Sequence, residues 1–359
     1  MSTRRRFLQA GAGAAGMAGP LPLAAGQPAR PIDEHDPANT KLAHRVVVKT
    51  TTDGDLLFLQ QIGMRWVRVE FGPGEGSFEH VRQTQERFAR FGMRIYSAVH
   101  PAYRSLRVQL GRPGRDEDIA TYCAFLRDLG RLGIPVASYD FHPANTYTTR
   151  EVERRGYTAR EFDVADFRAR VEKPRFEREY TAGEIWSHYA YFMKFALPAA
   201  ETAGVRMALH PDDPPLEKMN GVAKIFTHYD GYRRAEELAG RSRFWGLTLC
   251  VGTWAEGGSA MGKDVFEMIR EFGGRGRLFE VHFRNVTSPL PRFVETFPDD
   301  GYLDMYRVMK TLREVRFSGA AEPDHVPKLA GDQGLPRAGT AYCIASMRAM
   351  LRRANEEVG

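Results

Sequence analysis

Four residues with metal-binding side chains each follow an apolar run in the second half of the chain. They are His210, Cys250, His282 and Asp324, and the steps between them are 40, 32 and 42 residues. Each step is about the length of one strand and one helix, so in a parallel barrel the four side chains would meet on one rim. Two imidazoles, a thiolate and a carboxylate favour Mn, Fe, Co or Zn over Mg or Ca.

Each of these residues also has an ordinary structural explanation. A lone histidine at a strand end is usually a hydrogen-bonded structural residue, and a lone cysteine is usually a small buried hydrophobe. An aspartate in a Pro-Asp-His sequence could be a turn residue. Four suitable ligands at the ends of four consecutive predicted strands favour a metal site over four separate coincidences.

The alternation of apolar runs with helical patterns from residue 45 to the end predicts the fold that would position these ligands. The predicted strands are 45–49, 65–71, 94–99, 135–141, 205–210, 246–251, 278–284 and 319–323. The predicted helices are 55–62, 78–91, 117–132, 182–203, 232–238, 264–272, 302–315 and 341–355. Eight strands alternating with eight helices predict an α/β fold, a (β/α)8 TIM barrel.

A doubly wound open sheet uses the same alternation and is the alternative fold. That fold predicts a Gly-rich phosphate loop directly after the first strand. Residues 50–55 read Thr-Thr-Thr-Asp-Gly-Asp, without a GxGxxG pattern. The barrel is therefore favoured.

One connection, about residues 142–180 after the fourth predicted strand, is too long for a simple turn. It is rich in Arg, Glu, Tyr and Phe. Because an insertion at this end of a barrel commonly covers the active site, we expect a lid or a substrate collar. A solvated charged excursion or a contact within a homo-oligomer would explain the same composition, and the sequence leaves these alternatives open.

The first 26 residues resemble a twin-arginine signal peptide. Arg4 and Arg5 precede Phe7 and Leu8, and an Ala- and Gly-rich stretch follows. We therefore expect a signal peptide at 1–26, recognised by the twin-arginine export machinery, a linker at 27–44 and a single catalytic barrel at 45–359. The expected location is periplasmic or extracellular. A short disordered basic tail is the alternative.

Composition excludes several other classes of protein. The chain has 359 residues, is 43% hydrophobic and 27% charged, and carries a formal charge of +6. Removal of the signal would take away three arginines and leave about +3, with charges of both signs interspersed, so we expect no nucleic-acid partner. The three cysteines are too few for a disulfide framework.

The polar signatures occur in a series that resembles a known family. They are His-Pro-Asp-Asp-Pro-Pro at 210–215, Leu-Thr-Leu-Cys at 247–250, His-Phe-Arg-Asn-Val at 282–286 and Pro-Asp-His at 323–325. Together with Gly-Ile-Pro-Val at 133–136 and Tyr-Asp-Phe at 139–141, they resemble the D-mannonate dehydratase family over nearly all of residues 45–350. That family is related in fold to the xylose-isomerase-like barrels.

The resemblance implies roles for particular residues. The four ligand candidates would bind a divalent metal, Mn2+ or Fe2+. His325 lies at a catalytic position of the family, and Tyr342 is the expected second catalytic residue, because the chain lacks a downstream Pro-Gly-Tyr segment. The residues expected to contact substrate are Arg284, Asn285, Asp213 and His142. Family members remove water from D-mannonate to give 2-dehydro-3-deoxy-D-gluconate, so the expected ligand is a small sugar acid.

These residue types suit the elimination of water from a sugar acid. A metal stabilises charge on substrate oxygen, His or Tyr moves protons, and Arg284 offers bidentate geometry to a carboxylate. The chain departs from the family at Glu322, where Arg is common, and at Val326 and Pro327, which replace Gly-Arg. A related sugar isomerase, epimerase or lyase therefore remains an alternative, as does a non-catalytic sugar-acid binding protein.

Overall fold

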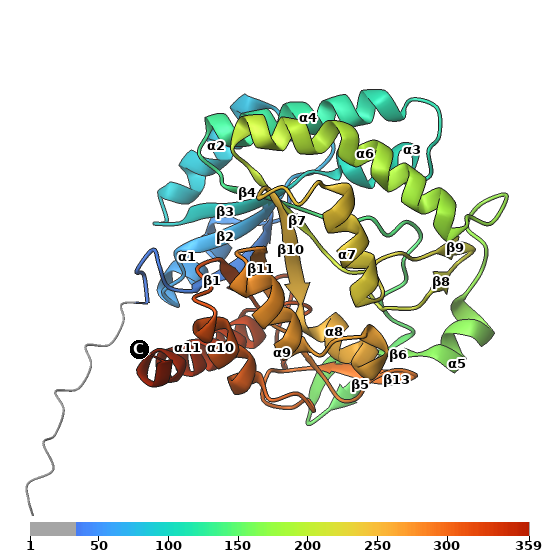
Figure 1. Cartoon of the computed structure of the whole chain (residues 1–359). Coiled ribbons are helices and arrows are strands. Elements are labelled where there is room, and N and C mark those ends of the chain that lie inside the picture. The colour runs from blue at the N-terminus through green and yellow to red at the C-terminus, as the bar shows by residue number, and fades with distance from the viewer. Residues whose placement is uncertain (1–33, 359) are drawn as a thin grey trace, which may run out of the picture. The chain divides into compact units, whose positions relative to one another are not determined.

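Eight parallel strands close into a barrel in a computed structural model that describes residues 34–358 (Figure 1). In order around the barrel they are β1 (Lys41–Val47), β14 (Ala320–Glu322), β11 (Leu278–His282), β10 (Trp245–Cys250), β7 (Arg206–Leu209), β4 (Val136–Tyr139), β3 (Arg94–Val99) and β2 (Trp66–Glu70). Each predicted strand has a counterpart, so the (β/α)8 prediction is confirmed. The predicted signal peptide lies outside the described residues.

The first barrel strand starts earlier than the sequence pattern indicates. β1 begins at Lys41, and its first residues pair with Ala320 and Ala321 of β14, which closes the barrel. The Lys41 ammonium donates a hydrogen bond of 2.8 Å to the carbonyl of Pro37. Residues 41–44, expected in a linker, are therefore part of the barrel. The apolar pattern missed them because Lys41 and His44 interrupt it.

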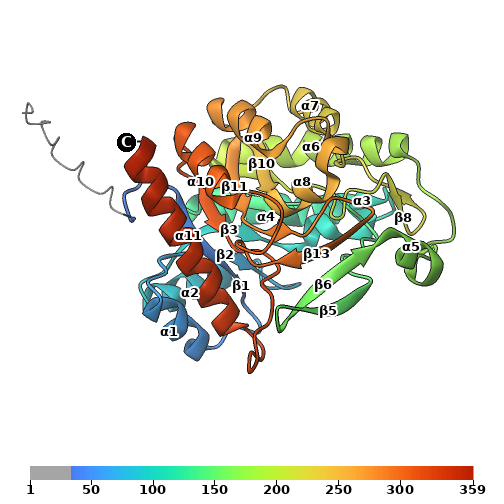
Figure 2. The ribbon, with the colours of Figure 1, turned by 90° about the horizontal axis from the view of Figure 1, so that it is seen from below.

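Helices surround the barrel (Figures 1 and 2). The main ones are α1 (Asp53–Gln61), α2 (Phe78–Ala89), α4 (Arg115–Arg131), α6 (Ala182–Ala203), α7 (Tyr229–Leu238), α9 (Val265–Met268), α10 (Met305–Glu314) and α11 (Arg337–Val358). Short helices α3 (Leu106–Gln109), α5 (Val164–Asp166) and α8 (Val251–Gly257) occur in the connections. Thr52 and Thr181 form capping boxes that start α1 and α6, and Gly204, at φ +70°, ends α6.

The predicted insertion folds into an ordered sheet. Strands β5 (Arg150–Arg154) and β6 (Tyr157–Asp163) form a hairpin, which joins β13 (Arg292–Thr296) and β12 (Asn285–Val286) in the order β12-β13-β6-β5. A small ribbon of β8 (Lys218–Met219) and β9 (Val222–Ala223) lies nearby in sequence. In Figure 1 the hairpin lies at the end of the barrel toward which the β10 arrow points.

Charged hydrogen bonds hold this sheet to the loops that follow the barrel strands. The Arg154 guanidinium donates to both carboxylate oxygens of Asp300, at 2.9 and 2.8 Å, and the Tyr157 hydroxyl donates to the same carboxylate at 2.6 Å. Arg292 donates to Glu161 at 2.7 Å across the β13–β6 pair. The insertion is therefore a fixed wall beside the mouth of the barrel.

Cys123, Cys250 and Cys343 are all buried free thiols, as expected for a chain without a disulfide framework. Among the helices of residues 34–358, none has the length and apolar character needed to cross a membrane.

Candidate metal centre

The alternation of side chains along strands places the ligand candidates at the barrel mouth. Thr248 and Glu280 share a hydrogen bond of 2.9 Å inside the barrel. Because successive strand side chains point to opposite faces, residues two positions further along β10 and β11 also point inward. These residues are Cys250 and His282, which pair in register at the ends of their strands.

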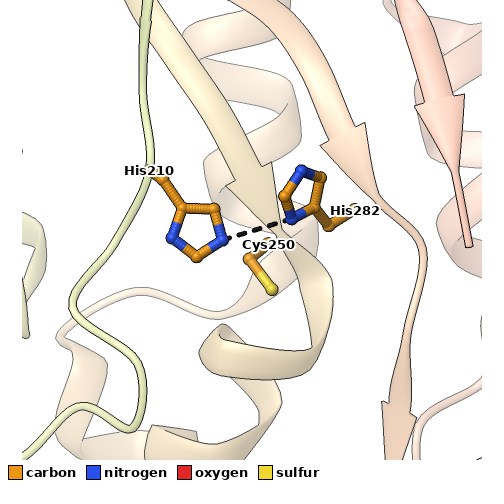
Figure 3. Close-up of side chains that lie close together, drawn as sticks. All are labelled: His210, Cys250 and His282. Carbon is orange, nitrogen blue, oxygen red and sulfur yellow. Dashed lines mark hydrogen bonds between the residues drawn. The ribbon is translucent and has the colours of Figure 1, made fainter. Parts of the chain in front are cut away.

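The candidate ligand atoms lie close together. His210, which directly follows β7, places Nε2 3.2 Å from Nδ1 of His282, and Cys250 lies beside them (Figure 3). Their ligand atoms all lie within 4.8 Å of one another, as do those of Cys250, Asp324 and Asp213. Metal–ligand bonds of roughly 2.0–2.3 Å in a tetrahedral site place donors about 3.3–3.8 Å apart. The donor set therefore fits a single divalent ion.

Neighbouring acceptors orient both imidazoles toward this centre. Nδ1 of His210 lies 2.8 Å from the carbonyl oxygen of Pro211, which can only accept, so this nitrogen carries the proton and Nε2 keeps its lone pair. Nε2 of His282 lies 3.1 Å from a carboxylate oxygen of Glu322, which leaves Nδ1 for the metal. Glu322, one of the departures from the family pattern, thus supports a ligand.

The Arg284 guanidinium lies at the centre of the buried charges. Its side chain is fully buried, and it donates to Asp213 at 2.8 Å and to the Cys250 sulfur at 3.4 Å. It also pairs with Glu295, with Glu256 at 3.0 Å and with Asp324 at 3.4 Å. The expected contact between Arg284 and substrate is therefore not supported, because the side chain is fully buried among protein anions.

A glycine makes room for this arginine. A Cβ atom added at Gly252 would lie 2.4 Å from Nε of Arg284. The first turn of α8, where Gly252 lies, must therefore carry no side chain at this position for Arg284 to reach the ligands. Gly252 thus leaves the space that the guanidinium occupies.

These charges set the protonation of two ligands. Burial raises the pKa of the Cys250 thiol, but Arg284, with His210 and His282, holds this pKa well below its usual range. Burial likewise opposes ionisation of Asp324, but His325, His282 and Arg284 keep the pKa of its carboxyl well below its usual range. The thiolate and the carboxylate are the forms that bind metal.

His325 lies beside the centre in an unusual backbone conformation. Its φ is +45°, which few non-glycine residues adopt and which costs of the order of 1–3 kcal/mol. Its Nδ1 lies 2.7 Å from Glu295 and 3.0 Å from the Arg284 guanidinium. A carboxylate can only accept, so Glu295 pairs with a protonated Nδ1, and Nε2 is then left for other partners.

The ligands open into a hollow of about 270 Å3. Its lining includes His210, His282 and Asp324, together with His325 and His142. An adjoining hollow of about 800 Å3 shares Asp324 and His325 with it. The site is thus a polar hollow with the candidate metal ligands at its floor, large enough for a small sugar acid.

The structure does not bring two of the predicted residues to this hollow. The Asn285 amide donates to the carbonyls of Pro298 and Leu303, at 3.0 and 2.9 Å, so it holds a loop instead of a substrate. Tyr342 is exposed and donates to Asp299 at 2.8 Å. The sequence placed Tyr342 near the site because it follows the expected position of a tyrosine, but the start of α11 directs it away.

Other predicted residues are present, and some were missed. Asp213 is buried and held by Arg284, and His142 lines the hollow. Tyr147, which sequence reasoning missed, also lines the hollow, with its ring centroid 5.9 Å from that of His325. Glu256 and Glu295 were missed too, although an arginine amid buried strands signals that carboxylates must surround it.

Replacement of Cys250 by serine tests the ligand set. Cys250→Ser removes the thiolate, so we expect the protein to lose most of its bound Mn2+ or Fe2+ in elemental analysis after dialysis. Cys123→Ser is the matched control, because Cys123 is also a buried free thiol but lies in the packing of α4. Equal metal content in wild type and Cys250→Ser would remove Cys250 from the site.

Comparison with known proteins places the chain in a family. The sequence model of the family D-mannonate dehydratase (UxuA) matches residues 163–356. The mannonate dehydratase of Streptococcus uberis is 32% identical over 285 residues, which are 72% of this chain and 80% of that protein.

The crystal structure of mannonate dehydratase from Streptococcus suis serotype 2 is 27% identical, with a TM-score of 0.79 over 89% of this chain and 96% of that one. A xylose isomerase domain protein from Planctomyces limnophilus shares only the fold, at 10% identity and a TM-score of 0.59, over 88% of this chain and 98% of that one. The chain belongs to the D-mannonate dehydratase family.

Proposed function

We propose that this enzyme is a metal-dependent hydro-lyase that converts D-mannonate to 2-dehydro-3-deoxy-D-gluconate and water. The observation that carries the proposal is the clustering of His210, Cys250, His282 and Asp324 at the floor of one hollow, which is lined by the two histidines, Asp324 and His325. The match to the D-mannonate dehydratase family supports the choice of reaction. The mixed nitrogen, sulfur and oxygen donors support Mn2+ or Fe2+ as the metal.

The reaction removes a proton from C2 and hydroxide from C3. A divalent ion bound by the four ligands supplies positive charge that stabilises negative charge on substrate oxygens. His325 takes the C2 proton at Nε2, because Glu295 accepts the proton on Nδ1 and leaves Nε2 with a lone pair. Glu295 then stabilises the imidazolium that forms. The enol product gains a proton at C3 to become the 2-keto acid.

Tyr147 is our candidate for the proton donor to the departing C3 hydroxyl. Its hydroxyl lies 3.0 Å from Nε2 of His142, whose Nδ1 lies 3.3 Å from the carbonyl oxygen of Pro211. Nε2 of His142 also lies 3.2 Å from a carboxylate oxygen of Asp140, which can only accept, so a proton on Nε2 leaves the single phenolic proton of Tyr147 available to the substrate. His142 thus holds the phenol on the wall of the hollow, beside His325.

Turnover of D-mannonate tests the proposal. We expect the Mn-loaded wild type to release a 2-keto-3-deoxy sugar acid, and His325→Asn to lose roughly 100- to 10,000-fold in kcat, the usual contribution of a general base. The metal content of the variant should equal that of wild type, since His325 is not assigned as a ligand. Absence of product with Mn2+, Fe2+ and other divalent ions would contradict the proposal.

A pair of tyrosine variants tests the proton donor. Tyr147→Phe removes one hydroxyl from the hollow, so we expect kcat to fall roughly 100-fold or more with metal content unchanged. Tyr342→Phe is the matched control and should retain full activity, because its hydroxyl contacts Asp299 instead of the hollow. Loss of activity in Tyr342→Phe, with Tyr147→Phe unaffected, would reverse the assignment.

We also propose that the twin-arginine route exports the protein to the periplasm or beyond. Arg4 and Arg5 followed by Phe7 and Leu8 support this, and export of a folded chain would let the Cys250 thiolate bind metal beforehand. Cell fractionation of an Arg4→Lys, Arg5→Lys double variant should find the protein retained in the cytoplasm. Arg6→Lys, outside the pair, is the control. Identical fractionation of the double variant and wild type would refute export by this route.

A further inference from the structure

The sugar-acid substrate of the proposed function carries a carboxylate next to the carbon that loses its proton. A side-chain cation in the hollow would bind that negative charge with strong charge-assisted hydrogen bonds. Arg284 does not meet this need, because Asp213, Glu295 and the other buried anions surround it. Another cation on the wall of the hollow is therefore the candidate to bind the substrate carboxylate.

Four arginines line the smaller hollow, and three already have carboxylate partners. The Arg45 guanidinium lies 2.7 Å from Glu70, and that of Arg104 lies 2.6 Å from Asp140. Arg68 pairs with Glu70 at 3.2 Å and lies 3.6 Å from Glu322. The charges of these three are thus largely neutralised within the protein.

The fourth, Arg160, has no such partner. Across residues 34–358, its guanidinium takes part in no ion pair and no side-chain hydrogen bond. Its side chain is exposed, whereas its neighbours Ala159 and Glu161 are buried. Arg160 lines the hollow, whereas Glu161, on the other face of β6, pairs with Arg150 and Arg292.

The backbone that carries Arg160 is held on both sides. Thr158 and Lys328 exchange two backbone hydrogen bonds, of 2.9 and 3.0 Å, between β6 and the segment after His325. On the opposite face, Glu161 accepts hydrogen bonds from Arg292 at 3.0 and 2.7 Å. Arg160 therefore extends from a fixed strand, and its guanidinium remains free to meet a ligand.

The position of Arg160 also suits the reacting carbon. The substrate carboxylate is bonded to C2, so the residue that binds it must lie in the same part of the site as His325. Arg160 and His325 each line both the smaller and the larger hollow. The two residues therefore stand where the hollows meet.

We propose that Arg160 binds the substrate carboxylate and makes the enzyme selective for sugar acids over neutral sugars and polyols. This assignment rests on the proposed function. Arg160 supplies an unpaired, bidentate donor to a planar anion, while Arg45, Arg68 and Arg104 maintain the charged walls around it. It is a residue of specificity and positioning, which acts without taking part in proton transfer.

Binding and turnover of Arg160 variants test this proposal. We expect Arg160→Gln to weaken the calorimetric Kd of the Mn-loaded protein for D-mannonate by roughly tenfold to a hundredfold, as for loss of a charged hydrogen bond. KM should rise by a similar factor, while bound metal is unchanged. Arg160→Lys should restore part of the affinity, because it keeps the charge without the bidentate geometry.

Arg168→Gln is the matched control. Arg168 belongs to the same insertion, is exposed, and lines neither hollow. The proposal would be overturned if Arg160→Gln kept the wild-type Kd and KM for D-mannonate. It would also be overturned if Arg168→Gln lost as much affinity for D-mannonate as Arg160→Gln. D-mannitol, the neutral analogue, should bind wild type and Arg160→Gln equally weakly.

The same titrations separate this proposal from the proposed function. A wild type that binds D-mannonate but forms no product would contradict the dehydratase assignment, and the comparison of Kd values would still decide the role of Arg160. A wild type that turns over D-mannonate, with Arg160→Gln indistinguishable from it, would overturn the role of Arg160 alone. A wild type that binds no D-mannonate would overturn both.

Discussion

Arg284 brings a permanent positive charge into a part of the barrel mouth where its side chain has no exposure, and the surrounding groups compensate that charge. Asp213, Glu295, Asp324 and the Cys250 thiolate all lie around the guanidinium. Loss of one partner from such a buried pair typically costs about 3–5 kcal/mol, because the remaining charge stays buried and unpaired. The same interactions therefore keep two ligands ionised and fix their positions.

The barrel and the insertion meet at this cluster. The barrel supplies the metal ligands at the ends of β7, β10 and β11 and just after β14, whereas the sheet containing β13 and β6 supplies Glu295 and Arg160. Glu295 contacts both Arg284 and His325, so the sheet orients the candidate base as well as closing the site. The insertion is thus part of the chemical site, and the barrel strands alone would leave the site without its base partner.

Sequence alone predicted the parts of the site that follow from strand periodicity. His210, Cys250, His282 and Asp324 were predictable because each directly follows an apolar run, and parallel strands end on one rim. Tyr147, Glu295 and Arg160 were not predictable. Tyr147 and Arg160 lie in the insertion and Glu295 lies in a long connection, and the hydrophobic pattern of these segments does not show how they fold. Asn285 and Tyr342 were misplaced because a motif match does not determine where a side chain points: Asn285 lies in β12 and bonds to backbone carbonyls, and Tyr342 lies in α11 and bonds to Asp299. The start of β1 was missed because polar residues interrupt its apolar pattern.

We propose that one metal ion is bound jointly by the thiolate of Cys250, the imidazoles of His210 and His282, and the carboxylate of Asp324. X-ray absorption spectroscopy of the Mn-loaded or Fe-loaded protein tests this joint coordination, because sulfur scatters differently from nitrogen and oxygen at bonding distance. We expect one sulfur atom bonded to the metal, together with nitrogen scatterers that carry the outer-ring signature of two imidazoles. A spectrum with only oxygen and nitrogen neighbours, and no sulfur, would contradict it.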